Sequence, residues 1–253
     1  MILVLSRDPT LRNPLQKWLD RSVIREREVQ GESIMLLHPG MKTDWQKTAQ
    51  KLGRYASRVV CPQSIELPKE RPWRRMDCTK VKEKLLTNTL CSYSDRLEWV
   101  GVYDPDGRHT MMVWELAQHF PRVTVWCSFR ERYESVSEEL MEQLGAAPEL
   151  TCNWDGFMGC PLIAAMEAPE FRLRWDGEML LCGSCDVPPL MGTLRQNLRL
   201  EVPQEWREIC PCDLDPQELY LAFLQESRKA IPKDLHYQTN ITPEDAGEIE
   251  KFL

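Results

Sequence analysis

One stretch of the chain constrains its fold more than any other: residues 101–128, GVYDPDGRHTMMVWELAQHFPRVTVWCS. An apolar run ends at Tyr103 and is followed by a tight turn, Asp-Pro-Asp-Gly. Apolar residues at helical spacing come next, which indicates a strand, a turn and an amphipathic helix. The β-branched and aromatic run over residues 122–127 predicts a second strand. This order of elements is typical of a parallel α/β unit.

Related patterns on both sides divide the chain into three segments. Residues 1–92 contain three short apolar runs, which predict buried strands, and apolar residues at helical spacing between two of them. This pattern predicts a smaller α/β domain. Residues 93–200 predict the main parallel-sheet domain. Residues 201–253 predict a helical tail that packs on the core, with helices that begin after Asp215 and Thr242, each of which is followed by proline.

The charge balance argues against one class of partner. The chain has 32 Lys and Arg against 39 Asp and Glu, so its formal net charge is -7. Nucleic-acid binding needs a basic face that releases counterions. The basic stretch KERPWRR, from Lys69 to Arg75, is short and flanked by acids. We therefore expect no nucleic-acid partner.

Two further features bear on location. No apolar run approaches the about 20 residues that a membrane-spanning helix needs. The first residues, MILVLSRDP, have the pattern of a first strand rather than of a secretory signal. We expect a cytoplasmic protein with no membrane partner.

Ten cysteines need an explanation other than disulfide bonds in such a protein. Cys182 and Cys185, taken with Cys210 and Cys212, form a candidate zinc set. The Cys-Pro-Cys spacing of the second pair is tighter than in a structural zinc site. We predict buried or incidental thiols and no metal.

Residues 98–190 resemble the NAD(P)-binding domain of the shikimate dehydrogenase and glutamyl-tRNA reductase type. The resemblance rests on the stretches VGVYDPDGRHTMMVWELAQHF, VTVWCSFRERYESVSEELMEQLGA, CPLIAAMEAP and EMLLCGSCDVPPL. In that family the second strand leads through a polar turn to a helix that ends in Leu-Gly-Ala, and prolines follow the fourth and fifth strands. The resemblance implies a Rossmann-like domain of dehydrogenase ancestry over residues 93–200.

The turn departs from the family pattern. The family turn is rich in glycine because one glycine makes the bend and another lets the backbone approach the pyrophosphate. Here Asp104 and Asp106 take those places and only Gly107 remains. Two carboxylates repel a pyrophosphate, by up to about 4 kcal/mol for each contact at roughly 4 Å. Alternatively, these residues simply make a good turn in which Asp106 caps the helix. A second cap is expected where Ser128 and Glu131 fit a capping box.

If a cofactor binds, the resemblance implies phosphates at the turn and adenosine beside the end of the second strand. The candidate cofactor-binding residues are Asp104, Asp106, Gly107, Arg108, His109, Ser128 and Arg130. The family's asparagine–arginine pair for a 2′-phosphate is replaced by Cys127 and Ser128, so NAD and NADP both stay open. The family's catalytic lysine–aspartate pair has no match in residues 1–92, and no catalytic residue is assigned.

Two functions follow from these patterns. The first is a catalytically degenerate protein of dehydrogenase ancestry that binds a small metabolite or a protein partner. The alternative is an active NAD(P)-linked oxidoreductase, or another nucleotide-binding enzyme, with a divergent phosphate loop. We favour the first because the glycines that the phosphate needs are replaced by acids.

Overall fold

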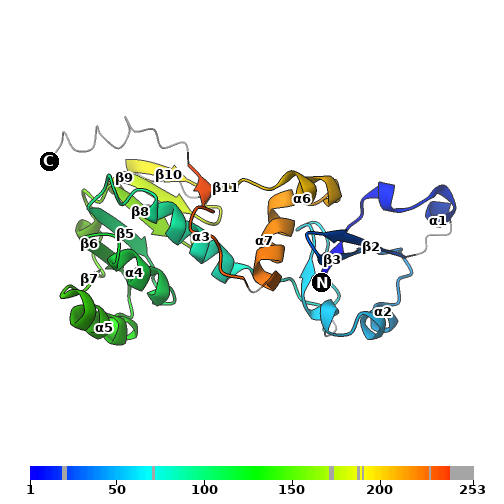
Figure 1. Cartoon of the computed structure of the whole chain (residues 1–253), viewed down its shortest axis with the longest axis horizontal. Coiled ribbons are helices and arrows are strands. Elements are labelled where there is room, and N and C mark those ends of the chain that lie inside the picture. Colours follow the sequence, from blue (N-terminus) through cyan, green and yellow to red (C-terminus); the bar gives the residue numbers. More distant parts are fainter. Residues whose placement is uncertain are drawn as a thin grey trace. The chain divides into compact units, whose positions relative to one another are not determined.

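The computed structural model describes residues 1–18, 22–69, 72–170, 174–186, 189, 191–227 and 229–239 (Figure 1). The chain forms two compact units: Met1–Val81 with Glu201–Ala230, and Lys82–Leu200 with the residues from Ile231 onward. The sequence-based boundary at residue 200 coincides with this division, but the first unit ends at Val81 rather than at residue 92 and also includes residues 201–230. The predicted helix after Thr242 lies outside the described residues.

The first unit is built on a four-stranded sheet in the order β2-β3-β1-β4. Its strands are β1 (Ile2–Leu5), β2 (Val23–Val29), β3 (Glu32–His38) and β4 (Val59–Val60). Its helices are α1 (Pro14–Trp18), α2 (Trp45–Leu52), α6 (Gln204–Ile209) and α7 (Pro216–Ser227), with short 3-10 helices η1 (Pro9–Leu11) and η2 (Gly53–Ser57). Strands β3, β1 and β4 are parallel and β2 is antiparallel to β3. The helix predicted after Asp215 is confirmed as α7, and Asp215 Oδ1 accepts a hydrogen bond from the Gln217 amide at 2.9 Å.

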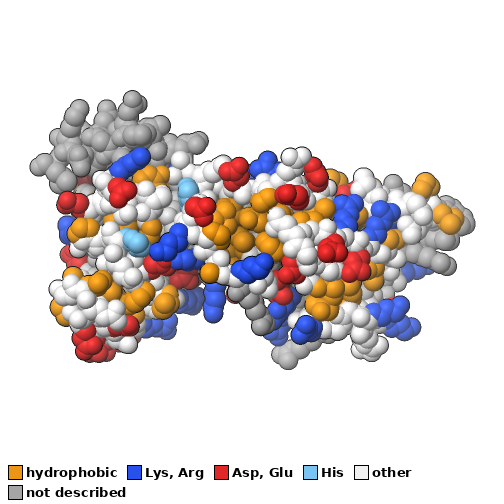
Figure 2. Space-filling model, viewed as in Figure 1, with side chains coloured by type: hydrophobic (Ala, Val, Ile, Leu, Met, Phe, Trp, Pro, Cys, Tyr) orange, Lys and Arg blue, Asp and Glu red, His pale blue; other side chains and the backbone are white. Residues whose placement is uncertain are grey.

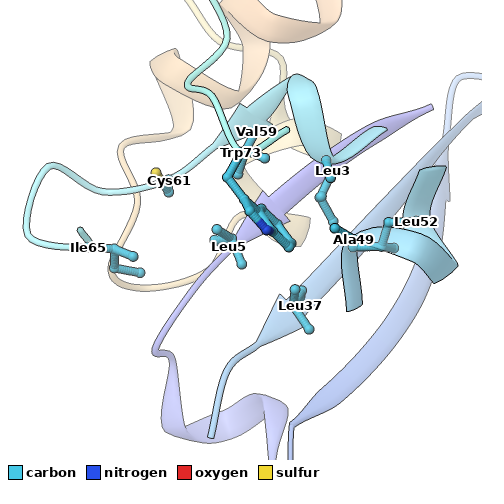
Figure 3. Packing of buried hydrophobic residues seen from close by; sticks show 10 residues of the cluster. Leu3, Leu5, Leu37, Ala49, Leu52, Val59, Cys61, Ile65 and Trp73 are labelled. Atoms are coloured by element: carbon cyan, nitrogen blue, oxygen red, sulfur yellow. The ribbon is translucent and has the colours of Figure 1, made fainter. Parts of the chain in front are cut away.

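Apolar side chains from the strands and from α2 form the core of this unit. Figure 3 shows Leu3 and Leu5 of β1 beside the indole of Trp73, with Leu52 of α2 in the same cluster. These side chains are at most 6 % exposed. The runs that the sequence identifies as buried strands thus supply the core, as their apolar character predicts.

Strand β2 is a strand that the sequence analysis does not predict. Its residues, VIREREV, alternate charges of opposite sign and are mostly exposed, so they lack the apolar alternation of a half-buried strand. Gln30 and Gly31, both with positive φ, form the two-residue turn to β3. Arginine and glutamate alternate along β2, so regular antiparallel pairing with a second copy would oppose like charges. That pattern protects an open sheet edge.

The second unit contains a six-stranded, all-parallel sheet in the order β10-β9-β8-β5-β6-β7. Its strands are β5 (Trp99–Tyr103), β6 (Arg122–Trp126), β7 (Glu149–Thr151), β8 (Leu162–Ala165), β9 (Arg174–Leu181) and β10 (Met191–Arg195). Numbered from β5, the strands run 3-2-1-4-5-6 across the sheet when read from β7, which is the doubly wound Rossmann order. The prediction of a Rossmann-like α/β fold is confirmed. The order reverses between β5 and β8, which places a topological switch point beside the end of β5.

The connections between these strands change in character along the chain. Helix α4 (Thr110–Ala117) links β5 to β6, and η3 (Arg130–Tyr133) with α5 (Glu134–Leu144) links β6 to β7. The connection from β7 to β8 holds only η4 (Trp154–Phe157). The described residues of the β8–β9 and β9–β10 connections contain no helix. Helix α3 (Thr79–Cys91) and the strand pair β11 (Arg199–Leu200) and β12 (Tyr237–Gln238) complete the described elements. None of the described helices is both long and apolar enough to cross a membrane.

Aromatic side chains pack where η4 meets the sheet. Trp154 stacks on Tyr103 and Trp126, with ring centroids 5.7 and 5.8 Å apart, and Phe157 lies beside it. The Phe157 ring packs directly against Gly101 of β5, because a Cβ at residue 101 would collide with that ring. Bulky rings and a glycine thus fill the layer that a crossover helix would otherwise cover.

The sheet predicts a test at Gly177 of β9. A Cβ there would collide with the carbonyl oxygens of Cys160 and Pro161, which are backbone atoms that cannot rotate away. Gly177→Ala should therefore lower the free energy of unfolding by about 1–3 kcal/mol, as overpacking does. Gly183→Ala is the matched control, because a Cβ at Gly183 meets nothing within 4 Å. Equal unfolding midpoints for the two variants in urea would contradict the close approach of β9 to residues 160–161.

Candidate functional site

The turn that joins β5 to α4 lies at the carboxyl end of the sheet, next to the switch point. The Gly107 amide donates a hydrogen bond to the Asp104 carbonyl at 3.2 Å. Gly107 has a φ of +64°, a conformation that favours glycine. A Cβ at Gly107 would also lie 3.0 Å from the Arg132 Cβ. The strand, turn and helix predicted for residues 101–117 are therefore present.

The Asp104 carboxylate occupies the amide end of α4. Its Oδ1 accepts a hydrogen bond from the Arg108 amide at 3.0 Å, and its Oδ2 accepts one from the His109 amide at 2.8 Å. The Tyr133 hydroxyl donates a third hydrogen bond to Oδ2. Asp104 is only 1 % exposed. Free amides at a helix N-terminus bind anions such as phosphate, and here a carboxylate of the chain itself takes that place.

Two predicted caps are wrong. Asp106 does not cap α4: the N-cap position is His109, no side chain caps the helix, and Asp104 instead accepts from the Arg108 and His109 amides just before it. The Asp106 carboxylate instead forms an ion pair with Arg108, with Oδ2 and Nη2 2.5 Å apart. Ser128 and Glu131 form no capping box, because a 3-10 helix over Arg130–Tyr133 follows Phe129 without a side-chain cap.

The segment after β6 lies against the outer side of the turn. The Ser128 amide donates to the Pro105 carbonyl at 3.1 Å. Arg132 Nη1 donates to the Asp106 carbonyl at 2.6 Å, and the same side chain backs onto Gly107. The chain's own backbone and side chains therefore contact the turn from the side where the resemblance implies a cofactor.

Arg108 and Arg130, the two basic residues of the predicted binding set, both have partners. Arg108 lies between two carboxylates, because its Nη1 is also 3.4 Å from Glu167 Oε1. Arg130 Nη2 lies 3.9 Å from the sulfur of Cys152. The structure thus brings Arg108 to the turn, where acids neutralise its charge.

A buried polar cluster extends from Asp104 to α3. His109 is 6 % exposed, and its Nδ1 lies 3.3 Å from Glu83 Oε2. Burial lowers the pKa of His109, but the Glu83 carboxylate and the charge of Asp104 outweigh burial, so the net pKa is raised above 6.5. Burial, followed by the charge of Asp104, raises the pKa of Tyr133, which keeps the hydroxyl protonated as a donor. The Tyr133 phenol thus stabilises the Asp104 carboxylate together with the two amides, and the raised pKa of His109 favours its imidazolium form beside Glu83.

The sequence analysis misses two members of this cluster. Neither Tyr133 nor Glu83 is among the candidate residues named from the sequence. A buried tyrosine usually finds a partner for its hydroxyl, and that rule gives a reason to look for an acceptor. Glu83 gives no signal, because it lies in an ordinary charged helix pattern and only the tertiary fold brings it to His109.

The surroundings of the turn are acidic. Burial raises the pKa of Tyr103 to about 12, and the charges of Glu170, Glu167 and Asp106 add to the effect. Burial likewise raises the pKa of Cys127 at the end of β6, with the charge of Asp104 as the second cause. Protonated, neutral side chains are favoured here, and a doubly charged diphosphate is disfavoured.

The candidate zinc cysteines are distributed over both units. Cys182 and Cys185 belong to the second unit, and Cys210 and Cys212 belong to the first. Burial raises the pKa of Cys182 and Cys210 to about 12, which favours thiols over the thiolates that bind metals. In the described part of the chain, no three His, Cys, Asp or Glu side chains come together as metal ligands.

No family model and no curated protein matches this chain. Among solved structures, it is similar to the probable ornithine cyclodeaminase of Bordetella pertussis Tohama I, with 12 % identity and a TM-score of 0.31 over 64 % of this chain and 48 % of that one. It is similar to the Thermococcus litoralis Δ1-pyrroline-2-carboxylate reductase solved with NADH and L-proline, with 11 % identity and a TM-score of 0.30 over 72 % and 69 %. It is also similar to L-tryptophan dehydrogenase of Nostoc punctiforme, with 12 % identity and a TM-score of 0.30 over 69 % of this chain and 54 % of that one.

The chain thus spans about half of the length of the first and third of these proteins. A shared fold at such low identity does not fix a function. None of the three is a shikimate dehydrogenase or a glutamyl-tRNA reductase, so that narrower resemblance stays a prediction.

The cluster predicts how the protein responds to loss of the Asp104 carboxylate. Asp104→Ala leaves two amides and the Tyr133 phenol without their acceptor, so the free energy of unfolding should fall by about 1–3 kcal/mol for each group left unsatisfied. Asp106→Ala is the matched control, since its half-exposed ion pair contributes no more than about 1 kcal/mol. Urea unfolding followed by far-UV circular dichroism measures both. Similar losses for the two variants would show that Asp104 is not the central acceptor.

A second prediction concerns pH. The pKa of His109 is raised in the folded state, so its stabilising contribution is complete below 6.5 and is lost as pH rises through the raised value. The pKa of His38, in the first unit, is lowered by burial, and its contribution has the opposite sign. The difference in unfolding free energy between the wild type and His109→Gln should therefore shrink from pH 6 to pH 9. A difference that is constant or grows with pH would contradict the imidazolium assignment.

Proposed function

We propose that this chain is a Rossmann-like protein of dehydrogenase ancestry that is catalytically degenerate and binds a small metabolite or a protein partner. The observation that carries the proposal is the buried Asp104 carboxylate on the Arg108 and His109 amides. Those amides lie in the turn just before α4, where a dinucleotide's pyrophosphate would be held in this fold.

Displacing Asp104 would be costly for any phosphate ligand. The carboxylate would lose two amide donors and stay buried, and each lost charge-assisted hydrogen bond is worth about 1.5–3 kcal/mol. Micromolar affinity corresponds to only about 8 kcal/mol. The acids beside Arg108 add repulsion. These terms together leave little favourable free energy for NAD or NADP at this turn.

A partner other than a dinucleotide fits the exposed side chains of the same unit. Met111 of α4, Phe129 before η3, and Met141 and Leu144 of α5 are between 42 % and 68 % exposed. Large apolar side chains left in water are a common feature of surfaces that bind proteins or small apolar molecules. They support the binding role without defining the partner.

The test is a thermal-shift panel with NAD⁺, NADH, NADP⁺ and NADPH on the wild type. A ligand at 100 times its Kd adds about 2.7 kcal/mol, which raises Tm by several degrees in a chain of this size. We expect no shift with any of the four. We also expect none for Asp106→Gly, because Asp106 does not lie on the amides.

Two outcomes would overturn the proposal. A saturable rise in Tm with NAD⁺ or NADP⁺ in the wild type would restore the oxidoreductase alternative. A rise that appears only in Asp106→Gly would show that repulsion from Asp106, and not occupation by Asp104, is what keeps phosphate out.

A further inference from the structure

The first unit contains two adjoining hollows lined by arginine. Each has a volume of about 380 Å³, and the two share Ser57, Arg58 and Glu226. One extends to Arg54, and the other extends to Arg74. We call the pair the arginine groove. Its volume is in the range of pockets that hold small molecules, about 300–1,000 Å³.

Backbone pairing fixes the arginines in the groove. Arg58 immediately precedes β4, and its amide donates to the Tyr55 carbonyl at 3.1 Å. Residues 74–76 run alongside β4, because the Val59 amide donates to the Arg74 carbonyl and the Met76 amide donates to the Val59 carbonyl, both at 2.9 Å. Arg58 and Arg74 therefore come from two backbone segments that are hydrogen-bonded to each other.

Arg75 has a different task. Its Nη1 donates to the Cys61 carbonyl at 2.6 Å, and its Nη2 donates to the Pro62 and Ile65 carbonyls at 3.0 and 2.7 Å. This guanidinium ties the loop after β4 to residues 74–76. It stabilises the wall of the groove through hydrogen bonds to carbonyl groups.

The groove carries more positive than negative charge. Arg58 pairs with Glu226 at 2.7 Å. In the part of the chain that the structure describes, neither Arg54 nor Arg74 has an ion-pair partner. The chain as a whole has a net charge of -7. On the face shown in Figure 2, acidic and basic side chains are interspersed, so a hollow lined by several guanidinium groups is a local exception.

We propose that the arginine groove binds a small anion with at least two negative charges, of the phosphate or carboxylate class. Guanidinium groups present paired N–H donors that match the oxygens of phosphate and carboxylate. Arg54 and Arg74 add their guanidinium charges to that of Arg58, while Glu226 and Asp77 oppose any anion that binds. This site lies in the first unit, so it does not rest on the proposed role of the Asp104 turn in the second.

The test is isothermal titration of the full chain at low ionic strength with sodium pyrophosphate and, separately, with citrate. We expect saturable binding of at least one of them. Arg74→Gln should weaken it about tenfold, the loss of one charge-assisted hydrogen bond. Glu226→Gln should strengthen it, because it removes the opposing carboxylate. A preference for pyrophosphate assigns the phosphate class, and a preference for citrate assigns the carboxylate class.

Arg207→Gln on α6 is the matched control, because this exposed arginine of the same unit does not line either hollow. It removes the same overall charge and should leave the affinity unchanged. The proposal is overturned if neither anion binds saturably, if Arg74→Gln binds as the wild type does, or if Arg207→Gln weakens binding as much as Arg74→Gln. A melting curve for each variant confirms that the fold is retained.

Discussion

The hydrogen bonds from the Arg108 and His109 amides to the Asp104 carboxylate organise the second unit. A helix N-terminus exposes N–H groups and carries partial positive charge, so it needs an anion or water beside it. In dinucleotide-binding proteins of this fold, the pyrophosphate fills that need. Here the carboxylate of Asp104, the first residue of the turn, lies on the amides just before α4. Tyr133, the last residue of η3, donates to the same carboxylate, so the end of β5, the residues just before α4 and η3 meet at one acceptor.

This arrangement separates the stability of the turn from the binding of a ligand. A glycine-rich phosphate turn leaves its amides available and depends on the ligand or on water to satisfy them. The Asp104 turn is satisfied without one, and its acceptor is buried. The Rossmann strand order persists around it, with helical connections before β7 and aromatic packing by Trp154 and Phe157 after it. The Rossmann strand order and a buried carboxylate on the two amides thus occur together in this unit.

Local patterns in the sequence predicted much of this scaffold. The apolar face of α4 and the β-branched run of β6 each follow the period of their own element. Local sequence alone therefore predicted the central β5-α4-β6 unit, with no information on the segments that pack against it. Strand β2 could not, because its alternating Arg and Glu carry no burial signal and its place depends on pairing with β3. The same limit applies to capping. Asp106 is a suitable cap residue by type, but α4 has no side-chain cap, and only the path of the turn brings Asp104 to the Arg108 and His109 amides.

Sites assembled from distant residues were the least predictable. Glu83 reaches His109 through the packing of α3, which no spacing in the sequence encodes. The basic stretch around Arg74 is visible in the sequence, but its role depends on pairing with the strand that follows Arg58. Both sites form only when segments far apart in the chain come together.

The central claim concerns two backbone amides, and an NMR titration observes them directly. In ¹⁵N–¹H spectra of the wild type, the Arg108 and His109 amide signals are followed as NAD⁺ and then pyrophosphate are added. The account predicts that both signals stay in place, because their protons are already donated to Asp104. If both signals move together along a saturable curve, the amides are open to phosphate and the account is wrong.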